Sequence, residues 1–181
     1  WTWLVTNPSS SNFSRVYLVA NNSNLNGNVN GYYVMIGGTN DEISLYKQTG
    51  TTSTKIIDGR NGTVSVSSVD ANVRVTRSAT GLWQLSSDTS ATSSTFISEG
   101  TVTDNTHLQS LFFGVYCKFT STRFDKFFFD DFAVTGTPAV DNTKPTLDSI
   151  NVISNTVLEL IFDEPVDLTT SQNTNNYSAN N

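Results

Sequence analysis

Short stretches of alternating hydrophobic and polar residues dominate the first 135 positions of the chain. They are rich in Val, Ile, Tyr, Phe and Thr, and glycine-containing turn clusters separate them. Runs of this kind, about ten residues apart, are typical of the β-strands of a sandwich or jelly roll. The predicted strands are Phe13–Ala20, Tyr32–Ile36, Ile43–Gln48, Lys55–Asp58, Thr63–Ser67, Asn72–Arg77, Leu82–Ser86, Thr95–Ser98, Leu111–Phe119 and Phe124–Val134.

Alternation also assigns faces to the strands, because successive side chains of a strand point to opposite sides of the sheet. Ile43 and Leu45 are expected on one face, with Ser44 and Tyr46 on the other. Helix is expected nowhere in this part, and residues 104–110 form a turn at most. The Asn-rich segment 21–30 has too few apolar residues to pack, so it is expected to be a solvated surface loop. The alternative is that its amide groups bind a cation or a glycan.

Composition supports an all-β protein. Ser, Thr and Asn make up 69 of the 181 residues, whereas charged residues contribute only 14%. Short hydroxyl and amide side chains compete with the helical backbone, so a mainly helical protein is excluded. An aromatic content of 11% excludes a disordered chain. The single Cys rules out an internal disulfide, and the single His rules out a multi-histidine metal site.

The net charge of −6 is spread along the chain without a cluster of Lys or Arg. A site that follows the phosphates of a nucleic acid is therefore not expected. No apolar run approaches the roughly 18 residues of a membrane-spanning helix, so no membrane span is expected either.

The composition of the sequence changes at residues 136–145, where Gly, Thr and Pro are frequent, as is typical of a linker. Two further strands are predicted at Asp148–Ile153 and Thr156–Phe162. The expected organisation is a β-sandwich at residues 1–137, a linker at 138–145 and the truncated start of a second β domain at 146–181. Because the chain opens on Trp1-Thr2-Trp3 without an initiator Met or a signal peptide, we expect a processed chain or an excised piece.

Several segments resemble the concanavalin A/laminin G-like jelly-roll modules of secreted multidomain surface proteins of the Bacteroidota type. The matching segments are Asn7-Pro8-Ser9-Ser10-Ser11-Asn12, Asn30-Gly31-Tyr32-Tyr33, Ser44-Leu45-Tyr46-Lys47-Gln48-Thr49-Gly50, Val73-Arg74-Val75-Thr76-Arg77, Gly81-Leu82-Trp83, Phe113-Gly114-Val115-Tyr116-Cys117 and Phe128-Phe129-Asp130-Asp131-Phe132-Ala133-Val134. In the tail, three segments resemble the start of a bacterial Ig-like domain: Lys144–Ile150, Leu158–Asp167 and Asn175-Asn176-Tyr177.

The resemblance implies an extracellular or cell-surface module that works beside other domains of the same polypeptide. It also implies one more strand before Trp1, which leaves either an exposed sheet edge or a place filled by a partner's strand. Related jelly rolls hold a structural Ca²⁺ with an Asp of the last strand, which makes Asp131 the first candidate ligand and Asp130 the second. The alternative is that these carboxylates pair with Arg123 or Lys126 at the surface.

No catalytic array stands out. A glycosidase of this fold needs two carboxylates that flank one bond, and Asp41-Glu42 is an adjacent pair whose side chains would face opposite ways on a strand. His107 lies in a polar segment without a nucleophile motif and is expected to be a solvated loop residue. Cys117, in an apolar strand, is expected to be an inert buried thiol. We therefore expect no enzyme.

Aromatic residues are the remaining candidates, because sugar-binding sandwiches use Trp or Tyr for stacking and add polar groups for the hydroxyls. We expect Tyr32 to be exposed beside the Asn-rich loop and, with Tyr33, Arg74 and Trp3, to form a ligand-binding site. Trp1, Tyr46 and Tyr116 are further platform candidates. Trp83, Phe112, Phe113, Phe128 and Phe132 are expected in the core.

The sequence thus predicts a non-catalytic extracellular binding or adhesion module, directed at a glycan or another cell-surface polymer. A structural spacer that presents other domains is the alternative, and a glycan-active hydrolase is a third possibility.

Overall fold

The computed structural model describes residues 2–5, 8–90, 95–136 and 144–178, with the backbone alone at residues 2–5. The chain divides into two compact units, Trp1–Val134 (unit 1) and Thr135–Asn181 (unit 2). Most of the predicted linker at 138–145 lies outside the described residues.

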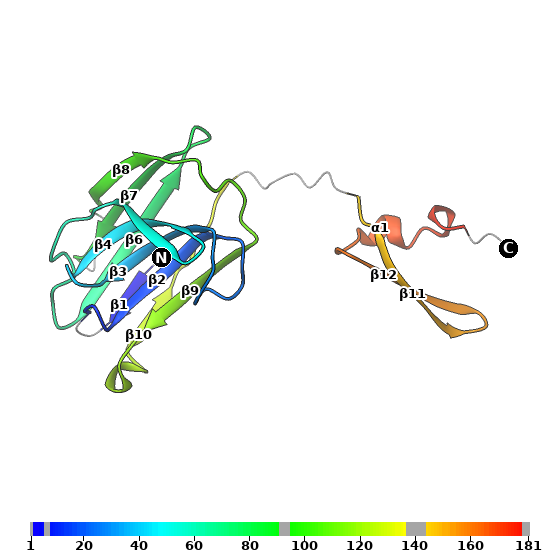
Figure 1. Ribbon diagram of the computed structural model, residues 1–181, viewed down its shortest axis with the longest axis horizontal. Helices are drawn as coiled ribbons and strands as arrows, with labels where there is room; N and C mark the ends of the chain where they lie inside the picture. The colour runs from blue at the N-terminus through cyan, green and yellow to red at the C-terminus, as the bar shows by residue number, and fades with distance from the viewer. Residues whose placement is uncertain (1, 6–7, 91–94, 137–143, 179–181) are drawn as a thin grey trace. The chain divides into compact units, whose positions relative to one another are not determined.

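Unit 1 is built from β-strands that form two antiparallel sheets, which Figure 1 shows as two layers. One sheet, called the β6 sheet, has the order β10-β1-β6-β7-β8, and the other, called the β3 sheet, has the order β5-β4-β3-β2-β9. The strands are β1 (Thr2–Val5), β2 (Phe13–Ala20), β3 (Gly31–Gly37), β4 (Glu42–Thr49), β5 (Thr52–Ile57), β6 (Val69–Arg77), β7 (Leu82–Asp88), β8 (Ile97–Thr103), β9 (Phe112–Lys118) and β10 (Phe127–Asp130), with a 3₁₀ turn η1 (Ser121–Arg123) before β10.

The main hydrophobic core lies between the two sheets. Its buried residues come from alternate positions of strands on both sides, as the sequence pattern predicts. The fully or nearly fully buried members include Val34, Ile36, Ile43, Leu45, Val73, Trp83 and Leu85. Burial of each such side chain stabilises the fold by roughly 1.5–3 kcal/mol. The predicted all-β sandwich, the inward faces of Ile43 and Leu45 and the core position of Trp83 are confirmed.

Several predicted strands differ from the observed ones. The strand β1 was not predicted, and β8 shares only residues 97 and 98 with the predicted run Thr95–Ser98. Residues 63–67 form turns instead of a strand, because Gly62 takes a φ of 74° and its N–H donates to the carbonyl of Asn40. Val64 still becomes buried there. The strand predicted at Phe124–Val134 is limited to Phe127–Asp130, since Asp131 takes a left-handed φ of 56° that ends the extended backbone.

Four phenylalanines predicted in the core are exposed instead: Phe112, Phe113, Phe128 and Phe132 have exposed fractions of 40%, 44%, 56% and 41%. They belong to, or directly follow, β9 and β10, which are edge strands of the two sheets. An edge strand has no neighbour on one side, so its large side chains stay partly in solvent. Phe113 and Phe132 instead pack edge to face, with ring centroids 5.3 Å apart.

Unit 2 begins with a β-hairpin of β11 (Leu147–Ser154) and β12 (Val157–Phe162), which confirms both strands predicted in the tail. A short helix α1 (Leu168–Ser171) and a 3₁₀ turn η2 (Thr174–Asn176) follow. The Asp167 carboxylate caps α1 by accepting a hydrogen bond from the Thr170 N–H at 2.9 Å.

Candidate functional site

Three tyrosines form a row across the side of the β3 sheet that faces away from the core. Tyr17 of β2 pairs with Tyr33 of β3, and Tyr33 pairs with Tyr46 of β4, so the three residues stand directly opposite one another. The Tyr17 and Tyr33 rings are 4.9 Å apart, and the Tyr33 and Tyr46 rings stack at 5.1 Å and 6°. The row arises because each tyrosine alternates with inward-facing apolar residues on its strand.

A second row beside the first carries a positive charge. Arg15 of β2 pairs with Met35 of β3 on one side and with Tyr116 of β9 on the other. The guanidinium carbon of Arg15 lies 4.9 Å from the Tyr33 ring centroid and 5.4 Å from that of Tyr116. A guanidinium within about 6 Å of an aromatic face is attracted to the ring electrons.

We call this surface the tyrosine face. It comprises Phe13, Arg15, Tyr17, Tyr33, Met35, Tyr46, Tyr116 and Lys118. Tyr17 and Tyr33 are buried within it, whereas Arg15, Met35, Tyr46 and Tyr116 are half-buried and Lys118 is exposed. Burial raises the pKa of Tyr17, Tyr33 and Tyr46 above the usual tyrosine value.

The Asn-rich segment 21–30 forms a wall at one end of the tyrosine face. Val29 is fully buried, and a Cβ on Gly114 of β9 would lie only 2.9 Å from Leu25 Cδ1, so Leu25 covers that glycine. The Gln48 amide of β4 donates from Nε2 to the carbonyl of Gly27 at 2.8 Å, and its Oε1 accepts from the Tyr17 hydroxyl at 2.6 Å. The segment is a largely exposed loop, as predicted. The expectation that it has too few apolar residues to pack is wrong, because Leu25 and Val29 suffice to anchor it.

Side chains within the wall also hold its backbone. Asn22 Oδ1 accepts from the Asn24 N–H at 2.9 Å, and Asn24 Oδ1 accepts from the Asn26 N–H at 3.1 Å. Asn30 Oδ1 accepts from the Gly50 N–H at 2.9 Å. These asparagine turns replace the missing ladder of backbone hydrogen bonds, so the wall has a defined shape.

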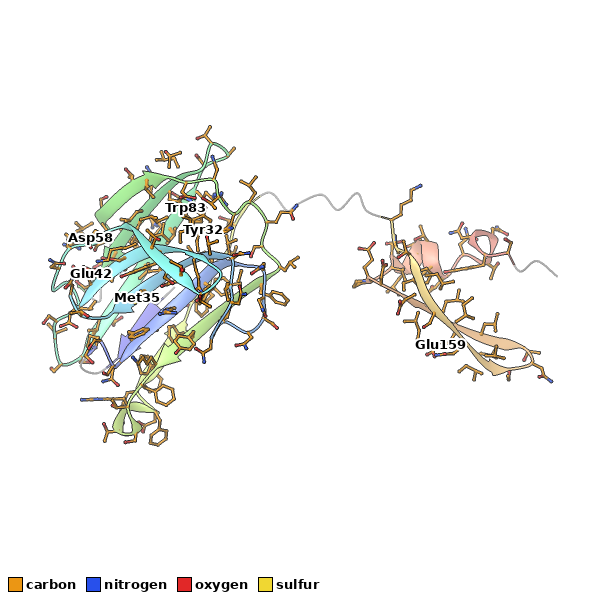
Figure 2. The ribbon with its side chains drawn as sticks, in the orientation of Figure 1. Tyr32, Met35, Glu42, Asp58, Trp83 and Glu159 are labelled. Atoms are coloured by element: carbon orange, nitrogen blue, oxygen red, sulfur yellow. The ribbon has the colours of Figure 1, made fainter. Side chains whose placement is uncertain are left out.

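Charged groups flank the tyrosine row at β5. Lys55, opposite Tyr46, is ion-paired with Glu42 and with Asp58 at 2.5 Å; Figure 2 labels both carboxylates. Burial by itself lowers the pKa of Lys55, but hydrogen bonds from Lys55 to Asp58 and Glu42 outweigh that effect and raise it. Glu42 is 2% exposed and also accepts from the Ser44 hydroxyl at 2.8 Å, which fixes its carboxylate beside the row.

Tyr32 does not belong to this surface, and the expectation that it is exposed is wrong. Its side chain is fully buried between the sheets, where its ring lies 4.6 Å from that of Trp83 (Figure 2). Neighbours on one strand face opposite ways, so Tyr33 takes the outer side and Tyr32 the inner. Arg74, which was expected beside Tyr32, lies on the other face of β6 and packs over Phe96 at 4.1 Å. The guanidinium that lies beside Tyr32 is that of Arg77, whose carbon is 5.4 Å from the ring centroid.

The Tyr32 hydroxyl instead joins a buried network that links the two sheets. It donates to Asp104 Oδ1 at 2.5 Å and accepts from the His107 N–H at 3.2 Å. Asp104 Oδ2 is ion-paired with Lys47 at 2.6 Å. Burial raises the pKa of Asp104, but hydrogen bonds from Lys47, Tyr32 and Thr106 outweigh it and hold that pKa well below its usual value.

His107 is also more than a solvated loop residue. Its Nε2 lies 3.1 Å from the Thr49 hydroxyl, and its ring meets the Tyr32 ring edge to face at 5.5 Å.

Cys117 is half-buried in β9, and this burial raises the pKa of its thiol to about 11. A thiol with such a pKa is almost entirely protonated at neutral pH and reacts slowly.

The proposed calcium ligands lie at the end of β10. Both carboxylates are exposed, and Asp130 Oδ1 accepts from the Asp131 N–H at 2.8 Å. Ca²⁺ takes six to eight oxygen ligands. Among the described residues, no third His, Cys, Asp or Glu joins this pair as a metal-binding group. Within the described residues, neither Asp130 nor Asp131 forms an ion pair with Arg123 or Lys126. Lys126 is instead paired with Asp125. Calcium binding stays a prediction.

Part of the tyrosine face was predicted from the sequence. Tyr33, Tyr46 and Tyr116 were platform candidates and share the tyrosine face, while the side chain of Trp3 lies outside the described part of the structure. Arg15 and Tyr17 were missed. The sequence pattern could have identified them. Arg15 and Tyr17 lie on either side of the apolar Val16 in a predicted strand, so their side chains must point to the same face.

Comparison with known proteins adds no relative: no protein-family model, curated protein or solved structure matches the chain. None of the helices in the described ranges has the length and hydrophobicity that a membrane-spanning segment requires.

Proposed function

We propose that unit 1 is a non-catalytic extracellular binding module of the concanavalin A/laminin G-like jelly-roll type, directed at carbohydrate through the tyrosine face. The observation that carries this proposal is the row Tyr17–Tyr33–Tyr46, in register across three strands and outside the main core. In a two-layer sandwich the side of a sheet that faces away from the core normally carries polar residues. Tyr17 and Tyr33 are buried beneath this surface, and the half-buried rings of Tyr46 and Tyr116 beside them are the accessible aromatic groups that favour a ligand.

Carbohydrate suits the chemistry of this face. Sugar rings offer apolar C–H surfaces for aromatic side chains and hydroxyls for polar partners. Tyr46 and Tyr116 supply half-buried rings, and Arg15 and Lys55 supply hydrogen-bond donors between them and beside them. The wall at residues 21–30 closes one end of the face, so a bound chain would be confined on that side.

Binding is favoured over hydrolysis because the carboxylate nearest the row is occupied. Glu42 is buried and ion-paired with Lys55, and glycoside cleavage needs an acid and a second carboxylate free to flank one bond. The setting we propose is extracellular, since the surface is rich in Ser, Thr and Asn, with other domains of the polypeptide alongside. Unit 2, as the start of an Ig-like domain, belongs to the same proposal.

A structural spacer is the second candidate, and the division of the chain into two compact units favours it. A glycan array distinguishes the two functions. For a binding module, the full chain binds a subset of glycans, and Tyr46→Ala weakens that binding about tenfold, the value of one stacked ring. Tyr177→Ala in unit 2 is the matched control, because Tyr177 is also partly exposed but lies off the face. A blank array supports the spacer, and turnover of any polysaccharide overturns the non-catalytic assignment.

A further inference from the structure

Two cationic side chains stand together at the β2–β9 end of the tyrosine face. Phe13 pairs with Lys118 and Arg15 pairs with Tyr116 in the β2–β9 register, so Arg15 and Lys118 are diagonal neighbours on one side of the sheet. The guanidinium carbon of Arg15 and the Nζ of Lys118 lie 5.4 and 5.5 Å from the same Phe13 ring centroid. The two positive charges are therefore no more than about 11 Å apart.

Neither of these cations forms an ion pair with any carboxylate in the described part of the chain. Lys47, Lys55 and Arg60, by contrast, each pair with an acidic residue. Arg74, Arg77 and Arg123 also form no ion pair in the described part of the chain, so what distinguishes Arg15 and Lys118 is that both charges lie around one Phe13 ring. The chain as a whole carries a net charge of −6. The placement of these two cations makes this end of the face locally positive on an acidic protein.

Arg15 is also incompletely satisfied in the structure. Its Nε is buried and has no hydrogen-bond partner among the described residues. The surrounding rings of Phe13, Tyr33 and Tyr116 attract the charge but accept no strong hydrogen bond. Buried N–H groups normally have a partner, and a guanidinium fork matches the two oxygens of a carboxylate or the oxygens of a sulfate.

From this geometry we infer that Arg15 and Lys118 form an anion subsite that recognises an acidic sugar, through either a uronate carboxylate or a sulfate ester. The inference rests on the proposed function, since it names the class of glycan that the tyrosine face takes. The anionic group of one residue sits against Arg15, with Lys118 adding long-range attraction. The sugar rings extend over the half-buried Tyr116 and Met35 toward Tyr46.

The experiment measures binding of the full chain to polymers that differ only in charge. Polygalacturonate is compared with its fully methyl-esterified form, which has the same backbone with masked carboxylates. A second comparison, of dextran sulfate with dextran, tests recognition of sulfate esters. Isothermal titration calorimetry at low and high salt gives the affinities, because a contact between exposed charges weakens as salt screens it.

The variants separate an anion subsite from a general charge effect. Arg15→Lys keeps the charge but removes the fork, and it weakens binding of the acidic polymer about tenfold. Lys118→Gln weakens it about threefold, as expected for an exposed charge. The matched control is Arg74→Lys, which changes an arginine that also packs on a phenylalanine but lies in the other sheet, and it leaves binding unchanged. Thermal unfolding verifies that each variant is folded.

The outcomes are distinct. Tighter binding of either acidic polymer than of its neutral form, lost in Arg15→Lys, supports the subsite, and the arm that responds identifies carboxylate or sulfate. Equal binding of acidic and neutral forms, with Tyr46→Ala weakening both, overturns the anion subsite and leaves the carbohydrate function intact. If the glycan array and all four polymers show no binding, both proposals are wrong. Acid-selective binding that Arg15→Lys leaves unchanged also overturns the subsite, because the charge effect then lies elsewhere.

Discussion

Removal of one buried hydroxyl, in Tyr32→Phe, tests the link between the two sheets. The phenyl ring keeps its contact with Trp83, so packing is preserved. The variant loses the hydrogen bond to the charged Asp104, worth about 1.5–3 kcal/mol, and the one from the His107 N–H, worth about 1 kcal/mol. Since Asp104 keeps its ion pair with Lys47, we expect the free energy of unfolding to fall by about 3 kcal/mol.

Urea denaturation at neutral pH measures this loss, and the slope of the transition should stay unchanged because the exposed area is the same. In a thermal scan the same loss corresponds to a fall in Tm of about 10 °C for a unit of this size. Tyr46→Phe is the matched control, because the structure shows no hydrogen bond from its hydroxyl to a described residue. We expect that control to cost less than about 0.5 kcal/mol.

The effect has a defined pH dependence. The folded-state pKa of Asp104 lies well below its unfolded value of about 3.9, so its stabilisation is fully present above that value and is lost as the pH falls toward the folded pKa. Tyr32 contributes to this depression, so the stability gap between wild type and Tyr32→Phe should narrow below about pH 4. A gap at neutral pH no larger than that of Tyr46→Phe would refute the reasoning, as would a gap that stays constant down to about pH 2.

Three further predictions concern other parts of unit 1. Arg60→Ala leaves the fully buried Glu99 side chain without its cation and should cost about 3 kcal/mol in urea denaturation, whereas Arg74→Ala, at an exposed site, should cost less than about 1 kcal/mol; similar losses would contradict this. If Asp131 binds calcium, calorimetry detects heat in the wild type but not in Asp131→Asn, which tolerates the left-handed φ of 56°; no heat in the wild type refutes the site. In the folded protein, Cys117 should react with a thiol reagent at least about tenfold more slowly than in the urea-unfolded chain, because burial raises its pKa to about 11. The same shift should lower the free energy of unfolding as the pH rises above about 8.5, the pKa of the unfolded thiol. Equal reaction rates in the folded and unfolded protein would contradict the burial of the thiol.

The strands of unit 1 were largely predictable because hydrophobic alternation is a local property. β2 coincides with the predicted run Phe13–Ala20, and β4 extends the predicted run Ile43–Gln48 by one residue at each end. The run at 63–67 is an exception. Its Thr-Val-Ser-Val-Ser pattern suits a strand, but the turn hydrogen bonds around Gly62 leave Val64 as a single apolar anchor.

The candidate site was harder to predict, because period-two alternation does not say which side of a strand faces the core. Tyr32 and Tyr33 are the same residue type, and only the packing of the β3 sheet against the β6 sheet places Tyr32 inside and Tyr33 outside the main core. Hydrophobicity was also misleading at Phe112 and Phe128. A large apolar residue is buried only if a neighbouring strand covers it, and sheet order is not a local property.

The pairing of β1 with β10 has a mechanical consequence. In this antiparallel pair Thr2 stands opposite Asp130 and Val5 opposite Phe127, so the start of β1 and the end of β10 lie at the same end of the ladder. Tension applied at Thr2 and Asp130 therefore loads the interstrand hydrogen bonds one at a time, from the open end inward, instead of all together along the strand axis. Unit 1 should open by unzipping at low force, and the rate at which this short ladder separates would govern how long the sandwich survives under load.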